Sequence, residues 1–178
     1  MNWRGKLKGA GQSPPRVGLE EIVWSWLGAF LGMGAVGLIH AWMLSGLGLS
    51  LLIGSFGASA VLIYGAPKSP LAQPRNLMGG HLLSALVGVA VCRLLPEQAP
   101  LAGALAVATA IAVMHLTRTL HPPGGATALI AVIGGDAVRG LGFVYALVPV
   151  GLGAAVMLLV ALIFNNLPKG RRYPEFWY

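Results

Sequence analysis

The sequence predicts an all-α, polytopic membrane helix bundle made of two inverted repeats of three segments, in the order long, short and interrupted, long. Three observations lead to this prediction. The 178 residues are 56% hydrophobic and only 10% charged, whereas soluble domains have about 25% charged residues. Apolar residues form long runs, and one short motif occurs twice. We predict one membrane domain at residues 21–167, with basic tails at 1–20 and 168–178.

Four apolar runs meet or approach the length that crosses a bilayer as a helix. About 30 Å of hydrocarbon takes roughly 20 helical residues. The runs of this kind are 22–44, 77–95, 101–116 and 141–164. Between them lie two shorter, glycine-interrupted runs, 49–64 and 124–133, each beside a proline-rich polar stretch. If both short runs cross, the chain has six passes; if both are re-entrant, it has four.

The positive charges favour six passes. In that arrangement both tails share one side with Lys68, Arg75 and Arg118. This side then carries ten of the twelve Lys and Arg residues, and only Arg93 and Arg139 lie opposite. Four passes would reduce the split to eight against four. Because basic residues accumulate on the cytoplasmic side, we predict cytoplasmic termini in a bacterial inner membrane. Charge at membrane boundaries also accounts for the net +7 without a nucleic-acid partner.

The duplicated motif divides the chain into two halves. Residues 57–62 read Gly-Ala-Ser-Ala-Val-Leu, and residues 125–130 read Gly-Ala-Thr-Ala-Leu-Ile, an offset of 68 (125 − 57). The repeats therefore cover about 21–95 and 100–167, and three passes in each would invert the second copy. Inverted pairs of interrupted helices form midplane sites in many secondary transporters. Convergent helix packing is the alternative explanation of the motif.

Small residues at four-residue spacing predict close helix packing, either within the bundle or between the subunits of a homo-oligomer. The sets are Gly28 and Gly32; Gly80, Ser84 and Gly88; and Ala102, Ala106 and Ala110.

The most specific stretch, residues 121–128, reads His-Pro-Pro-Gly-Gly-Ala-Thr-Ala. With residues 54–60, 69–76 and 79–81, it resembles the signature blocks of the HPP family of integral membrane proteins, named for the His-Pro-Pro motif. The similarity covers residues 19 to 167. It implies four membrane spans, a transport function and, through plant chloroplast members, a link to nitrite.

The distribution of charge inside the apolar runs favours an anionic substrate. None of the runs contains Asp or Glu, whereas carriers of cations or protons commonly keep a buried carboxylate. Helix starts present free N–H groups and about half a positive charge, so the starts of the two short runs are the candidate binding site. The predicted substrate-binding residues are Ser55, Gly57, Ser59, His121, Gly124, Gly125 and Thr127.

Four further residues are predicted to line the entrance to this site on the basic side: Gln73, Arg75, Asn76 and His81. Two alternatives remain open. The hydroxyls of Ser59 and Thr127 could bond to their own helix backbone, and Arg75 could anchor a loop at the membrane surface. His81 and His121 lie beside the interrupted segments, where an imidazole could donate to an anion or change its charge near physiological pH.

Other chemistries find little support in the sequence. The four histidines, His40, His81, His115 and His121, have no recognised ligand spacing, so we predict neither a metal nor a cofactor. No motif for catalysis is visible, and we predict that the chain is not an enzyme. The leading hypothesis is a transporter or channel for a small anion, with nitrite as the candidate implied by the resemblance. The alternative is a non-transporting membrane module that anchors, senses or assembles.

Overall fold

The computed structural model describes Trp3, Leu7 and residues 11–44 and 51–178, and its elements there are helices without any strand. The all-α prediction is therefore confirmed for this part of the chain. The basic residues Arg4, Lys6 and Lys8 of the predicted N-terminal tail lie outside the described residues, as does the start of the run predicted at 49–64.

Four helical stretches of the described chain are long and apolar enough to cross a membrane: Leu19–Trp42, Pro74–Leu94, Ala99–Leu116 and Ala146–Phe164. The first comprises α2 (Leu19–Ile39) and part of the π-helical η1 (His40–Leu44). The second and third are α4 and α5. The fourth joins the π-helical η4 (Ala146–Gly151) to α8 (Leu152–Phe164), with a kink at Val148 and Pro149.

The fourth spanning helix begins later than the apolar run at 141–164 suggested. A separate short helix, α7 (Gly135–Leu141), is followed by its C-cap Gly142, whose φ of 51° lies in the left-handed region. Glycine adopts this conformation without the steric cost that a Cβ would add. The chain therefore turns at Gly142, and the long helix starts only at Ala146.

The two short runs form helices of equal length, α3 (Gly54–Gly65) and α6 (Pro122–Ile133), with 12 residues each. Their bounds differ by the offset of the motif, since 54 + 68 = 122 and 65 + 68 = 133. At 1.5 Å per residue, each is about 18 Å long, little more than half of the hydrocarbon thickness. A short 3₁₀ turn, Pro70–Ala72, separates α3 from α4.

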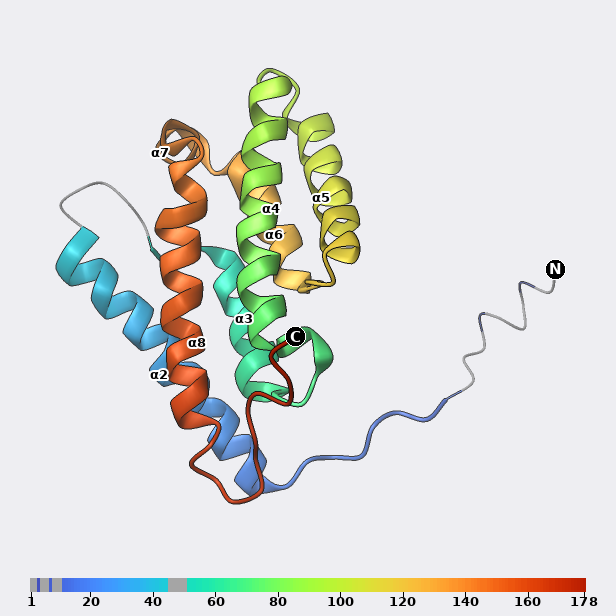
Figure 1. The fold of residues 1–178 in the computed structure, drawn as a ribbon, viewed down its shortest axis with the longest axis vertical. Helices are drawn as coiled ribbons and strands as arrows, with labels where there is room; N and C mark the ends of the chain where they lie inside the picture. The colour runs from blue at the N-terminus through green and yellow to red at the C-terminus, as the bar shows by residue number, and fades with distance from the viewer. Residues whose placement is uncertain (1–2, 4–6, 8–10, 45–50) are drawn as a thin grey trace.

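The six main helical segments alternate in direction (Figure 1). In this view α2 and α4 run upward, and α3, which connects them, runs downward. In the second half α5 and α8 run downward, and α6, which lies between them in the chain, runs upward. Six passes require this alternation, whereas the four spans implied by the family resemblance match the four long helices. The six-pass arrangement and the inversion of the second repeat remain predictions.

Tight contacts hold the short helices against the long ones. The Tyr64 ring of α3 packs against Gly28 and Gly32 of α2, where an added Cβ would lie 2.9 Å from the ring at Gly28 and 2.5 Å from it at Gly32. Its hydroxyl donates a hydrogen bond of 2.9 Å to the Met157 carbonyl of α8. The glycine spacing predicted to allow close packing thus accommodates an aromatic ring from a neighbouring helix.

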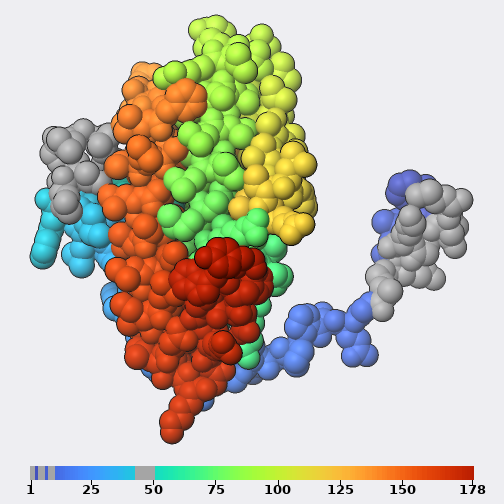
Figure 2. All heavy atoms as spheres, in the orientation of Figure 1, coloured from blue at the N-terminus to red at the C-terminus, as the bar shows by residue number. Residues whose placement is uncertain are grey.

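The outer surface of the bundle is apolar. Large side chains such as Phe30, Leu101, Ile111 and Leu159 are exposed, as expected of helices that face lipid rather than water. Figure 2 shows the last residues of the chain, in dark red, lying against the lower half of the bundle.

Candidate functional site

His81 of α4 lies between the two short helices and bonds to both. Its Nε2 is 2.7 Å from Ser59 Oγ of α3, and its Nδ1 is 2.8 Å from Thr127 Oγ1 of α6. Ser59 and Thr127 are equivalent in the two copies of the motif, since 59 + 68 = 127. All three side chains are fully buried. One imidazole therefore joins the matching hydroxyls of the two repeats.

His121 extends this arrangement toward the loop before α4. Its Nε2 is 2.9 Å from Ser59 Oγ, and its Nδ1 is 2.8 Å from the Leu71 carbonyl oxygen. The two imidazole rings meet edge to face, with centroids 5.0 Å apart. A carbonyl oxygen can only accept, so His121 Nδ1 carries a proton.

Thr127 completes the connection to the start of α3, because its hydroxyl donates to Ser55 Oγ at 2.9 Å. A second acceptor, the Pro123 carbonyl of its own helix, lies at 3.3 Å, so the predicted alternative of a bond to the helix backbone also applies to Thr127. The buried hydrogen-bonded groups form what we call the polar cluster: Ser55, Ser59, His81, His121 and Thr127. Tyr145 packs against it and donates from its hydroxyl to the Thr127 carbonyl at 3.2 Å. Phe56 packs edge to face against His81. No charged side chain of the described residues hydrogen-bonds to the cluster.

The start of α6 is built for close packing. Pro122 and Pro123 occupy its first two positions and have no N–H, and the Gly124 N–H bonds to the His121 carbonyl at 2.8 Å. A Cβ on Gly124 would lie 2.8 Å from both the Gly80 carbonyl oxygen and Ser84 Oγ. Gly124 therefore brings α6 against α4, and its predicted role in substrate binding stays a prediction.

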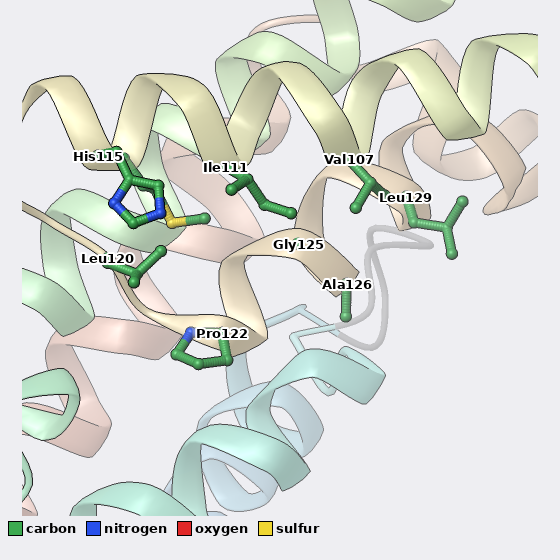
Figure 3. Close-up of a pocket in the computed structure, with 9 residues that line it drawn as sticks. Val107, Ile111, His115, Leu120, Pro122, Gly125, Ala126 and Leu129 are labelled. Carbon is green, nitrogen blue, oxygen red and sulfur yellow. The ribbon is translucent and has the colours of Figure 1, made fainter. Parts of the chain in front are cut away.

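The other two candidate glycines lie away from the polar cluster. Gly57 is exposed, and a Cβ there would meet no atom within 4 Å. Gly125 lies on the wall of a pocket of about 570 Å³ between α5 and α6. Figure 3 shows Val107, Ile111 and other apolar side chains lining this pocket. It is an apolar groove, unlike the polar midplane cavity expected of a transporter.

Three of the four predicted entrance residues fasten loops. Buried Gln73 donates from Nε2 to the carbonyls of Pro67 and Ser69, at 2.9 and 2.8 Å. Arg75 donates to the Thr117 carbonyl at 2.6 Å, and Asn76 to the Leu120 carbonyl at 2.8 Å. The Asn76 bond holds the residue just before His121. His81, the fourth, lies in the polar cluster itself.

Two residues at the site were not predicted. Tyr145 lies near the start of an apolar run, and its sequence neighbourhood carries no signal for a buried hydroxyl. Ser84 belongs to the small-residue spacing on α4, which indicated packing; its hydroxyl is buried and has no hydrogen-bond partner among the described residues.

The C-terminal segment folds back onto the bundle. Arg171 forms an ion pair of 2.7 Å with Glu21 at the start of α2, and also donates to the Tyr64 carbonyl and to Asn165 Oδ1. The Tyr173 hydroxyl donates to the Ala72 carbonyl at 2.8 Å, and burial raises the pKa of Tyr173 above its ordinary value of 10.0. The predicted basic tail at 168–178 is therefore partly an anchored element.

A buried polar cluster inside a helical bundle with an apolar outer surface defines a polytopic integral membrane protein. The chain belongs to the HPP family: the family profile described as "HPP, transmembrane region" matches residues 14–174. The family resemblance noted in the sequence is therefore confirmed.

Two curated relatives are both described as transmembrane proteins of Dictyostelium discoideum. One is 52% identical over 176 residues, covering 97% of this chain and 56% of the relative. The other is 49% identical over 179 residues, covering 99% and 62%. The chain thus spans between 56% and 62% of the length of these relatives. No solved structure matches the chain. Because both relatives are eukaryotic, the bacterial inner membrane remains a prediction.

Proposed function

We propose that the chain is a membrane transporter for a small anion, with nitrite as the candidate that the family resemblance implies, and that the polar cluster is its substrate site. The observation that carries this proposal is the position of His81, which joins equivalent hydroxyls of two half-length helices deep inside an apolar bundle. Polar and ionisable groups are expensive inside a membrane, and they commonly mark substrate or ion pathways.

The chemistry of the cluster suits an anion. Ser59, Thr127 and the imidazole N–H groups supply hydrogen-bond donors. No carboxylate of the described residues bonds to the cluster, so none would repel a negative charge at contact distance. In the present arrangement these groups bond to one another. Substrate binding would therefore exchange bonds within the cluster for bonds to the anion, as α3 and α6 separate around His81.

The setting of this transporter is part of the proposal. We propose that the protein works as a homo-oligomer with cytoplasmic termini, and that it has no catalytic step, metal or cofactor. The ten basic residues grouped on one side in the six-pass arrangement support the assignment of the termini.

The test is anion uptake by liposomes that contain the purified chain. Nitrite uptake is compared with that of nitrate, formate and chloride, for the wild type and for Thr127→Val, which keeps the shape of the side chain but removes its hydroxyl. A hydrogen bond to a charged group contributes about 1.5–3 kcal/mol, so we expect uptake to fall roughly 10- to 100-fold. Thr127→Ser, which keeps the hydroxyl, should stay within a few-fold of wild type.

Thr109→Val provides the matched control, because Thr109 lies on α5 outside the polar cluster. It should leave uptake unchanged. Equal losses of uptake in Thr109→Val and Thr127→Val would show that the polar cluster is not part of the transport pathway. If folded wild-type protein carries none of the four anions, the proposal of transport is wrong. The alternative then stands, a non-transporting module that anchors, senses or assembles in the membrane.

A further inference from the structure

The hydrogen bonds of the polar cluster can be assigned donor by donor, starting from a fixed end. The Leu71 carbonyl can only accept, so His121 donates to it from Nδ1. In a neutral His121, Nε2 is then an acceptor, and it faces Ser59 Oγ at 2.9 Å. Ser59 must therefore give its single hydroxyl proton to His121 if that bond is to form.

The hydrogen bonds at the other end of the cluster require the same hydroxyl proton of Ser59. Thr127 gives its hydroxyl proton to Ser55 Oγ or to the Pro123 carbonyl, so the bond of 2.8 Å between Thr127 Oγ1 and His81 requires a proton on His81 Nδ1. A neutral His81 then has a bare Nε2, which also faces Ser59 Oγ, at 2.7 Å. His81 Nε2 and His121 Nε2 thus compete for the single hydroxyl proton of Ser59.

One additional proton completes every bond without moving a heavy atom. With His81 protonated on both nitrogens, Nε2 donates to Ser59, and Ser59 donates to His121. When the proton leaves, both imidazoles are neutral and one bond of the cluster is left unmade, either between Ser59 and an imidazole or, if Thr127 turns its hydroxyl to His81 Nδ1, between Thr127 and Ser55. The cluster therefore makes one hydrogen bond more with the additional proton than without it.

We propose that His81, with Ser59 and His121, binds a proton together with the transported anion, so that the chain moves one proton with each anion. This inference rests on the proposed transport function and adds its coupling ion. Proton uptake forms an N–H bond at His81 and breaks an O–H bond of hydronium or of the protonated form of the anion, which is left as water or as the anion.

Charge balance explains why the proton and the anion would travel together. A buried imidazolium is costly unless an opposite charge accompanies it. The titratable neighbour of the cluster, Tyr145, is neutral and donates to the Thr127 carbonyl. Arg75, on the same helix as His81, bonds to the Thr117 carbonyl, and the Arg171–Glu21 pair is tied to the other end of α3. The described residues thus offer the imidazolium no carboxylate partner, and the anion supplies the missing charge.

The test uses liposomes loaded with potassium and a pH-sensitive dye, in which valinomycin sets the voltage. Nitrite and nitrate are added outside, and protein-free liposomes supply the baseline for passive diffusion of nitrous acid. For wild type we expect acidification of the lumen by one proton per anion, at a rate that does not change with voltage. An inward proton gradient of one pH unit supplies about 1.4 kcal/mol, which corresponds to about tenfold accumulation of the anion in the lumen.

Variants connect the coupling to the cluster. We expect His81→Gln, which cannot be protonated, to lose the acidification, and Ser59→Ala, which interrupts the link between the two imidazoles, to reduce it strongly. His115→Gln is the matched control, because His115 is exposed on α5 outside the cluster; it should behave as wild type. Since stoichiometry is measured on the wild type, the test stands even if a variant fails to fold.

The outcomes separate the two proposals. Wild-type anion uptake that responds to voltage and carries no protons would overturn the coupling and leave transport intact. Normal coupling in folded His81→Gln would overturn the role of His81. If no anion enters at all, the proposed function fails, and the coupling fails with it.

Discussion

Ser84 and Ser59 are both buried serines that differ in whether the hydroxyl has hydrogen-bond partners among the described residues. Ser84 Oγ has no hydrogen-bond partner among the described residues, whereas Ser59 Oγ lies within bonding distance of two imidazoles. A buried hydroxyl without a partner costs about 1–3 kcal/mol, while a typical bonded pair contributes about 1 kcal/mol. The two serines should therefore respond differently to the same truncation.

We predict that Ser84→Ala raises the free energy of unfolding by about 1 kcal/mol, because it removes a polar atom that gains nothing from the folded state. Ser59→Ala should lower it by about 1–3 kcal/mol, since it leaves ring nitrogens without a partner. Denaturant unfolding in detergent micelles measures both changes. Equal destabilisation by the two substitutions would show that Ser84 has a partner in solution.

At the scale of the elements, the closeness of α4 and α6 depends on glycine. A Cβ on Gly124 would lie 2.8 Å from the Gly80 carbonyl oxygen, and one on Gly88 would lie 2.5 Å from the Ala128 carbonyl oxygen. These neighbours are backbone atoms, which cannot turn aside as a side chain can. The distance between the helices, and with it the position of Thr127 beside His81, is set by these contacts.

We predict that Gly124→Ala lowers the free energy of unfolding by about 1–3 kcal/mol, because the two helices must separate to admit the methyl group. Gly57→Ala is the matched control: it also lies in a short helix, but in open space. There alanine should stabilise by up to about 1 kcal/mol through its higher helix propensity. The same denaturant titration checks both, and similar effects at the two positions would contradict the close contact.

At the scale of the whole molecule, the C-terminal segment ties several helices together. Arg171 is buried and reaches the start of α2 at Glu21, the end of α3 at Tyr64 and the residue after α8, Asn165. Glu21 is partly exposed, so the ion pair itself is screened by solvent and contributes little. The larger effect comes from the buried acceptors that Arg171 satisfies.

We predict that Arg171→Met lowers the free energy of unfolding by about 2 kcal/mol, since it leaves the Tyr64 carbonyl and the Asn165 side chain without their donor. The neighbouring Arg172 is exposed, and Arg172→Met should change stability by no more than about 0.5 kcal/mol. Unfolding of the two variants in micelles makes the comparison. An equal effect of the two would mean that the C-terminal segment does not hold the bundle together.

Composition and repetition were enough to predict the class and the segment order of this protein. Apolar runs report helix length directly, because each helical residue advances a fixed distance through the bilayer. The four long helices and two short ones follow from that rule. The motif offset of 68 also paired Ser59 with Thr127, and the structure brings both hydroxyls to one imidazole.

The sequence alone could not determine which helix faces pack against one another. His81 was predicted to line the entrance, beside an interrupted segment, and α4 carries it inward between α3 and α6. Gly124 was predicted to bind substrate, and its close contact with Gly80 on α4 could not be predicted from its place in the sequence. Arg75 and Gln73 were assigned to the same entrance, but they hold loops through backbone carbonyls. Residue spacing determines which side chains share a helix face. Only the packing of helices distant in sequence determines what that face touches.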